Sequence, residues 1–312
     1  MDQNIKDLVQ LAPEVGQALL EKRPVVALES TVIAHGLPQP MNLQAATRIE
    51  QTIRQRGATP ATIAILDGKI RYGLNERELE RLATAGNITK ASQRDLPLLL
   101  ARRGNGATTV SATVFLAALL GVKVLATGGI GGVHRDWQRS MDISTDLPTL
   151  ANTSMVVVCA GAKSVLDIPA TLEWLETHGV PVLGYRTDRF PGFYTPVTEP
   201  SLPIDLRVER TEDIAKIFEL RRRLGMKGSV LVCVPIPSHA ALTQREVDQA
   251  IAVALQAATE EDVRGRDLTP FLLESLSKTT GGRSLSANLT LLVNNASVAA
   301  DISKAVTPTE YV

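Results

Sequence analysis

Short runs of β-branched residues alternate with helical segments along most of this sequence, and this alternation is its strongest constraint on the fold. The runs predict strands at residues 25–28, 62–66, 122–127, 155–159, 180–183 and 230–234. A repeated strand, helix, strand order predicts an α/β fold with a largely parallel central sheet flanked by helices. With 312 residues, 44% of them hydrophobic, the chain is expected to form a single large domain spanning residues 1–312.

Helices are predicted between these strands, at residues 42–57, 109–120, 169–179, 211–225 and 284–304. Most of them end at a glycine, the residue that most easily takes the left-handed conformation after a helix. Asn42 is expected to cap the first helix. Residues 185–206 show no period and contain several aromatic and proline residues, so they predict a long loop near the site or at a subunit contact.

The charge and cysteine content exclude several classes of protein. Lys plus Arg (33) balances Asp plus Glu (33), so the sequence indicates neither a nucleic-acid groove nor an anionic membrane surface. Cys159 and Cys233 each lie in an apolar run, which is typical of buried thiols in a reducing compartment. Residues 1–22 lack a hydrophobic signal core, and no apolar run reaches membrane-spanning length. The protein is expected to be cytoplasmic.

Lys163 is the strongest candidate for a catalytic residue. It follows the apolar strand predicted at 155–159 after a short Ala-Gly-Ala step. An ammonium group there is expected to be partly desolvated, which favours the neutral amine, and a neutral amine attacks carbon. The alternative is a solvated lysine just before a helix, and the neighbouring motifs favour the nucleophile.

A glycine-rich turn and two acids precede this lysine. Residues 128–132 follow a predicted strand, and their backbone amides can hold a phosphate, although a tight turn without a ligand explains them equally well. Asp142 and Asp146 follow this turn. One aspartate is enough to hold a hydrated Mg²⁺ or Mn²⁺ beside a sugar phosphate; a solvated surface pair is the alternative. His134 is interpreted as either a polar contact or a ligand.

Two further charged residues lie where a pocket is expected. Glu29 ends the first predicted strand, at the edge of the sheet where an acid or base faces ligands; an ordinary charge at a strand end is the alternative. Lys90 can pair with a phosphate as a point charge, as many surface lysines also can. Residues 105–111 form a hydroxyl-rich helix start, which suits an anion site or a plain cap.

Several blocks in order resemble the pseudouridine-5'-phosphate glycosidases, also known as the indigoidine synthase A-like family. The resemblance runs nearly from end to end, and the blocks are residues 27–38, 104–111, 128–134, 142–146, 159–164, 284–288 and 294–295. It implies a cytoplasmic, manganese-dependent homo-oligomer, commonly a homotrimer, with one Mn²⁺ per subunit and Mg²⁺ as the other candidate metal. Such an enzyme reversibly cleaves pseudouridine 5'-phosphate to uracil and ribose 5-phosphate, in pseudouridine catabolism.

The resemblance also assigns roles to individual residues. It implies that Lys163 is the nucleophile, Glu29 the proton donor and Asp142 the metal ligand. The predicted substrate contacts are Lys90, Val110, Ser144, Thr145, Asp146, His134 and Asn288. Thr145 stands where alanine is frequent in the family, which affects only the local fit.

The chemistry of the residues fits this role. A base joined to ribose through carbon offers no lone pair at the bond to be broken, so protonating a heteroatom cannot release it. A lysine that forms an imine with C1' supplies the required electron push, and an acid then protonates the departing carbon. The rival interpretations are a lyase of aldolase type, which would release two carbonyl compounds, and a phosphosugar-binding regulator without catalysis.

Overall fold

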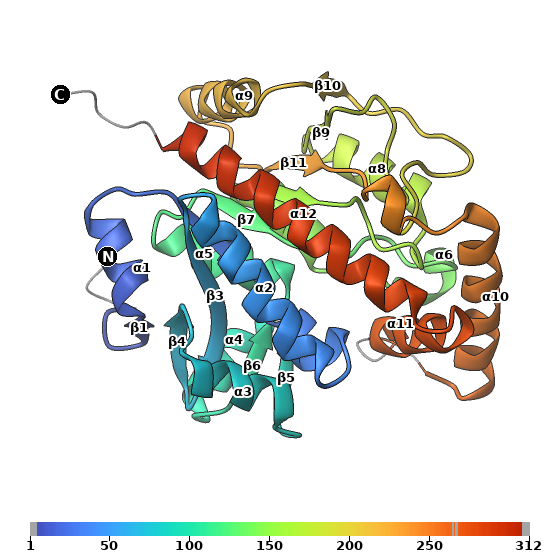
Figure 1. Cartoon of the computed structure of the whole chain (residues 1–312), viewed down its shortest axis with the longest axis horizontal. Helices are drawn as coiled ribbons and strands as arrows, with labels where there is room; N and C mark the ends of the chain where they lie inside the picture. Colours follow the sequence, from blue (N-terminus) through green and yellow to red (C-terminus); the bar gives the residue numbers. More distant parts are fainter. Residues whose placement is uncertain (1–4, 264, 266–267, 308–312) are drawn as a thin grey trace.

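One sheet of eleven strands runs through the part of the chain that this computed structural model describes, residues 5–263, 265 and 268–307 (Figure 1). Its order is β1-β4-β3-β2-β7-β8-β11-β9-β10, and β6 pairs with β3 while β5 pairs with β6. The strands are β1 (Val9–Leu11), β2 (Val25–Leu28), β3 (Thr59–Leu66), β4 (Lys69–Tyr72), β5 (Thr89–Ala91), β6 (Gly106–Thr108), β7 (Val124–Ala126), β8 (Val156–Cys159), β9 (Val182–Tyr185), β10 (Leu206–Val208) and β11 (Val230–Cys233).

Helices connect and cover these strands. They are α1 (Pro13–Leu20), α2 (Met41–Gln55), α3 (Glu76–Thr84), α4 (Leu96–Ala101), α5 (Val110–Leu119), α6 (Trp137–Ser140), α7 (Asp146–Asn152), α8 (Ile168–Thr177), α9 (Thr211–Arg223), α10 (Gln244–Glu260), α11 (Leu268–Thr279) and α12 (Arg283–Val306). Three shorter helical turns are the π-helical η2 (Val32–Gly36) and the 3₁₀ turns η3 (Gln93–Asp95) and η4 (Ser238–Ala240).

The predicted fold class is confirmed: the sheet is largely parallel and lies among helices. Every pair of neighbours from β3 through β2, β7, β8, β11 and β9 to β10 is parallel. The six predicted strands are all present, although β3 begins earlier than expected, at Thr59. Two strands that the sequence analysis missed, β4 and β6, run antiparallel to β3.

The five predicted helices are also present, but the predicted cap of the first one is wrong. That helix, α2, begins at Met41, so Asn42 lies inside its first turn and is buried. The Asn42 side-chain amide donates to the carbonyl oxygens of Ile33 and Ala83, each at 3.0 Å. It therefore ties α2 to η2 and α3, which satisfies two buried carbonyls that would otherwise lack partners.

The long helix α12 organises one face of the molecule. It packs against β2, β7 and β8, with α2 and α9 on either side, and Figure 1 shows these three helices as a layer in front of the strands. Helices α10 and α11 pack against each other as a hairpin at one end of this layer. Among the residues described, no helix is long and apolar enough to cross a membrane.

Candidate active site

The predicted nucleophile and proton donor lie at the same edge of the sheet. Strands β2, β7 and β8 are parallel neighbours, so the residues that follow them meet at their carboxyl ends. Glu29 directly follows β2, and the half-buried Lys163 lies in the turn after β8. The glycine segment after β7 lies beside that turn, because the Lys163 N–H donates to the carbonyl of Ile130 (3.1 Å).

A cavity of about 340 Å³ opens at this edge. It is lined by all the predicted site residues except one: Glu29, Lys90, Val110, His134, Asp142, Ser144, Thr145, Asp146 and Lys163. The exception is Asn288 on α12, which lines an adjoining hollow of about 50 Å³ that also contains Glu29, Lys90 and Lys163. The structure thus brings residues from most of the chain into one place, and their individual roles stay predictions.

Glu29 is buried and held by a residue that the sequence analysis missed. The residue is 9% exposed, and the Thr127 hydroxyl donates a hydrogen bond to its Oε1. Burial raises the pKa of Glu29, because the charged carboxylate is poorly solvated there; the positive charge of Lys163 and the Thr127 hydrogen bond oppose this effect. A carboxyl group that keeps its proton above the ordinary range is suited to act as a general acid.

Asp146 holds two segments of the backbone together. One carboxylate oxygen accepts from the Ser111 N–H at the start of α5, and the other from the Gly131 N–H, each at 2.8 Å. The N-terminus of a helix favours a negative charge, and at α5 the Asp146 carboxylate supplies that charge. Asp146 is 4% exposed, so it reaches the cavity as part of a fixed wall.

The glycine segment was predicted either to hold a phosphate with its backbone amides or to form a tight turn without a ligand. Several amides in and beside this segment already donate to other groups of the protein. The Ile130 N–H donates to the Gly161 carbonyl (3.1 Å), the Gly131 N–H to Asp146, and the Val133 N–H to Thr171 Oγ1 (3.0 Å). These amides already have partners inside the protein. The turn therefore shapes the cavity through its backbone.

The glycines of this segment are required by crowding. A Cβ on Gly131 would lie 2.2 Å from Ser144 Oγ, and one on Gly129 would lie 2.6 Å from the ring of Phe193. Real Cβ atoms do not approach other atoms so closely. The close packing of the loop that contains Phe193 and of residues 144–146 thus explains the glycines better than phosphate binding does.

Asp142 and His134 lie in the segment that follows the glycines and folds back on itself. Val133 and Ile143 pair as an antiparallel bridge, and the His134 N–H donates to the Asp142 carbonyl (3.0 Å). His134 Nδ1 lies 3.9 Å from Asp142 Oδ2. Burial lowers the pKa of His134, opposed by Asp142 and reinforced by the positive charges of Lys90 and Lys163. The imidazole is therefore neutral at neutral pH.

The residues present fit a hydrated metal ion better than an ion enclosed by protein. Within the described residues, no group of three or more His, Cys, Asp or Glu side chains is arranged to hold a metal. The Asp142 side chain is 29% exposed and lines the cavity. Mg²⁺ and similar hard cations commonly use one or two carboxylates, several waters and substrate phosphate oxygens. Asp142 can supply the carboxylate of such an ion.

Three other predicted contacts are positioned by short strands and turns. Lys90 lies in β5, opposite Ala107 of β6. The Ser144 hydroxyl accepts from the Asp146 N–H (3.2 Å), and the Thr145 hydroxyl lies 3.2 Å from the Ser111 hydroxyl. These hydroxyls stand beside the Asp146 carboxylate on one wall of the cavity.

Several residues around the site were not predicted. Besides Thr127, they include Thr31, Ser92, Arg94, Asp95 and, in the adjoining hollow, His35, Phe193, Thr269, Pro270 and Leu273. Thr31 follows Glu29 so closely that the strand-end argument could have included it. The residues of α11 carry no such signal, because their positions depend on how the α10–α11 hairpin packs.

The C-terminal asparagines have separate positions. Asn288 is 7% exposed, and its side-chain oxygen lies near Gly128. Asn295 is fully buried, and its side-chain amide donates to the Thr127 carbonyl (2.8 Å). Asn295 therefore fixes α12 to the end of β7, beside the threonine that holds Glu29.

The sequence and the fold both match known proteins. A profile of the family described as "Indigoidine synthase A like protein" matches residues 14–305. The chain is 53% identical to a pseudouridine-5'-phosphate glycosidase of Caldanaerobacter subterraneus subsp. tengcongensis, over 95% of each chain. It is 48% identical to one of Petrotoga mobilis, over 96% of this chain and 98% of the other.

Two solved structures share the fold. The prealnumycin C-glycosynthase AlnA in complex with ribulose 5-phosphate is 39% identical, with a TM-score of 0.88 over 98% of each chain. An indigoidine synthase A-like protein of Thermotoga maritima is 35% identical, with a TM-score of 0.87 over 96% of this chain and 97% of the other. The protein is therefore a member of the indigoidine synthase A-like family, to which the pseudouridine-5'-phosphate glycosidases belong.

Proposed function

We propose that this enzyme reversibly cleaves the C–C glycosidic bond of pseudouridine 5'-phosphate to give uracil and ribose 5-phosphate, in pseudouridine catabolism. The observation that carries the proposal is the placement of Lys163 and the buried Glu29 in one cavity, with Lys90 beside them. The names of the relatives support the same substrate, and the neighbour with bound ribulose 5-phosphate supports a pentose phosphate ligand.

The first half of the reaction is assigned to Lys163. Its amine, as the free base, attacks C1', and the C1'–O4' bond breaks, which opens the ribose ring. A proton passes from the attacking nitrogen to O4', so that O4' becomes a hydroxyl and the nitrogen regains its lone pair. The nitrogen lone pair then forms an iminium with C1' while the C1'–C5 bond breaks and its electrons remain on the uracil carbon. Glu29 donates its proton to that carbon, and uracil leaves.

The second half releases the sugar. Water adds to the imine, the C1'–N bond breaks, and Lys163 is restored together with ribose 5-phosphate. The full cycle consumes one water, and Glu29 recovers its proton from solvent. The raised pKa of Glu29 supports its role, because the proton must still be bound when the carbanion forms.

The remaining residues of the cavity position the substrate. Lys90 and the hydroxyls of Ser144 and Thr145 are assigned to the sugar phosphate, and Asn288 in the adjoining hollow to the base. Asp142 would hold one Mn²⁺, or Mg²⁺ in its place, whose positive charge would help to fix the phosphosugar. Fixing a reactive geometry in this way contributes a large share of many enzymatic rate enhancements.

We further propose that the enzyme acts in the cytoplasm as a homotrimer. A shallow surface hollow of about 740 Å³ lies between α5 and α7 beside Thr145. Its lining includes Phe115, Ala118, Leu119 and Pro148, and Leu119 is 40% exposed. An apolar surface so close to the cavity is where we expect a second subunit to pack. Sedimentation velocity of the purified chain measures its oligomeric state.

Two assays on the same protein test the reaction. Chromatography of an incubation with pseudouridine 5'-phosphate should show free uracil and ribose 5-phosphate in equal amounts. Borohydride added with ribose 5-phosphate should reduce the imine to a stable pentose-phosphate adduct on Lys163, detected by mass spectrometry of the peptide.

The matched controls are Lys163→Arg, which keeps the charge but has no nucleophilic amine, and Lys123→Arg, which changes a lysine outside the cavity. The first should give neither uracil nor adduct, and the second should behave as the parent. An adduct on another lysine, or uracil release by Lys163→Arg, contradicts the mechanism.

A further inference from the structure

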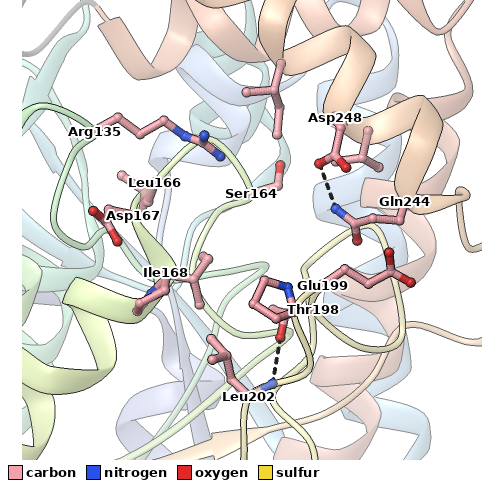
Figure 2. Close-up of a pocket in the computed structure, with 15 residues that line it drawn as sticks. Arg135, Ser164, Leu166, Asp167, Ile168, Thr198, Glu199, Leu202, Gln244 and Asp248 are labelled. Carbon is pink, nitrogen blue, oxygen red and sulfur yellow. Dashed lines mark hydrogen bonds between the residues drawn. The ribbon is translucent and has the colours of Figure 1, made fainter.

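A second cavity, of about 270 Å³, lies next to the reaction site and has no part in the proposed mechanism (Figure 2). It is separated from the first cavity by the turn that carries Lys163. Leu166 lines both cavities, and Ser164, the residue after Lys163, lines the second. A molecule bound in this second cavity would therefore touch the segment that positions the nucleophile.

Ser164 is the first observation that points to a ligand. The residue is 7% exposed, and among the described residues its buried hydroxyl has no hydrogen-bond partner. Buried polar groups are normally paired, since an unpaired one costs free energy. Ser164 is one of the residues that line the cavity, so a polar group of a ligand bound there can pair with this hydroxyl.

The charges around the cavity are the second observation. Figure 2 shows the Arg135 guanidinium and the Asp167 carboxylate on one side and the carboxylates of Asp248 and Glu199 on the other, with Ser164 between them. The Asp167 carboxylate already accepts from the Ala170 N–H at the start of α8 (3.0 Å), which leaves Arg135 as the cation of that side. Asp248 also accepts a hydrogen bond from the Gln244 side-chain amide (2.8 Å). A ligand with an anionic group near Arg135 and a cationic group near the two acids matches this distribution.

The floor of the cavity is apolar. Leu166, Val247 and Ile251 are each less than 5% exposed and line it together. A sugar phosphate has no apolar body for this floor, and its two negative charges would face Asp248 and Glu199. A compact zwitterion with an apolar side chain satisfies both the floor and the rim.

One helical hairpin lines both cavities. Helix α10 supplies Val247, Asp248 and Ile251 to the second cavity, and α11 supplies Thr269 and Leu273 to the hollow beside Lys163. The two helices pack against each other. A ligand that holds α10 in place therefore also holds α11 over the substrate.

We propose that the second cavity binds a free α-amino acid with an apolar side chain, and that this ligand and the pentose phosphate strengthen each other's binding. The carboxylate pairs with Arg135 and Ser164, and the ammonium pairs with Asp248 and Glu199. The coupling rests on the proposed function of the first cavity, whereas binding of the amino acid does not.

Calorimetry of the full-length protein tests the binding without any turnover. L-leucine, L-isoleucine, L-valine and L-methionine are titrated one at a time, followed by the N-acetyl derivative and the methyl ester of each. At least one amino acid should bind, and both derivatives should bind at least about 10-fold more weakly, because each lacks one of the two charges. The absence of binding by all four amino acids, or unchanged binding of their derivatives, overturns the proposal.

Three variants place the binding in this cavity. Asp248→Lys reverses an exposed charge of the rim and should abolish binding without disturbing the core. Ile251→Trp should fill the cavity and abolish binding, while Val253→Trp adds the same ring at a position of α10 that is 48% exposed and should leave it intact. Amino-acid binding that survives both Asp248→Lys and Ile251→Trp contradicts the site.

The coupling is measured by repeating the titration at saturating ribose 5-phosphate. The amino acid should bind at least about 5-fold more tightly, and ribose 5-phosphate should gain the same factor in the reverse experiment. Equal affinities with and without ribose 5-phosphate would overturn the coupling while the amino-acid site remained. If ribose 5-phosphate itself does not bind, the function proposed for the first cavity fails instead.

Discussion

Replacing Asp146 by asparagine should destabilise the protein before any substrate is added. The carboxylate accepts two buried backbone N–H groups, from Ser111 and Gly131, at 2.8 Å each. Asparagine keeps one acceptor oxygen and turns an NH₂ group towards the other N–H. One hydrogen bond to a charged group is then lost, at about 1.5–3 kcal/mol, and the second is weakened because its acceptor is neutral. The expected total is a loss of about 2–4 kcal/mol in the free energy of unfolding.

Thermal unfolding makes this loss visible. An unfolding entropy of about 2.1 cal/mol/K per residue corresponds to about 0.65 kcal/mol/K for 312 residues, so the melting temperature should fall by about 3–6 °C. Asp188→Asn, which changes an exposed carboxylate, is the matched control and should leave the melting temperature within about 1 °C of the parent.

Turnover separates the structural role of Asp146 from a direct contact with substrate. If Asp146 holds the wall of the cavity, Asp146→Asn should lower both the melting temperature and kcat, since residues 144–146 and the glycine segment would shift together. An unchanged melting temperature with a raised KM alone would refute this reasoning and make Asp146 a substrate ligand only.

Three further predictions concern the cavity itself. Glu29→Gln should lower turnover by about 10²- to 10⁴-fold. In the parent, kcat should fall as pH rises through the raised pKa of Glu29, because the proton donor is then lost, and the pH–rate profile of Glu29→Gln should lack this limb. Chelation should reduce turnover, and added Mn²⁺ should restore it in the parent but poorly in Asp142→Asn; full activity of the metal-stripped parent would contradict the metal assignment. Lys90→Met should raise KM for pseudouridine 5'-phosphate by about 10- to 150-fold and leave free pseudouridine unaffected, so equal effects on both substrates would place the phosphate elsewhere.

The parts of the fold that sequence predicted best are those with a strong period. The parallel strands are short apolar runs such as 155–159, and the whole of β8 lies within that run. The hairpin between β3 and β4 was missed, although Asp67-Gly68 carries a signal for it. Both residues have positive φ (52° and 70°), as a two-residue hairpin turn requires. The strand predicted at 62–66 ends just before them, and no turn or second strand was predicted to follow it.

The site was predictable to the extent that its residues follow strands. Glu29 and Lys163 follow β2 and β8, two parallel strands on either side of β7, and a position after a strand is one that sequence alone can indicate. Thr127 lies in the predicted strand at 122–127, but nothing local shows that its hydroxyl meets Glu29. The α11 residues over the hollow depend on the packing of a hairpin far along the chain, which no local pattern encodes.

The crowded glycines divide the site into a part that tolerates mutation and a part that does not. At Gly129 and Gly131 every other residue would collide with Phe193 or Ser144. A saturation library should therefore contain almost no active variants at these two positions. Helix α11 lines the hollow beside Gly129 with the side chains of Thr269, Pro270 and Leu273. Directed evolution towards new C-glycosides should therefore begin at α11 and leave the glycine segment untouched.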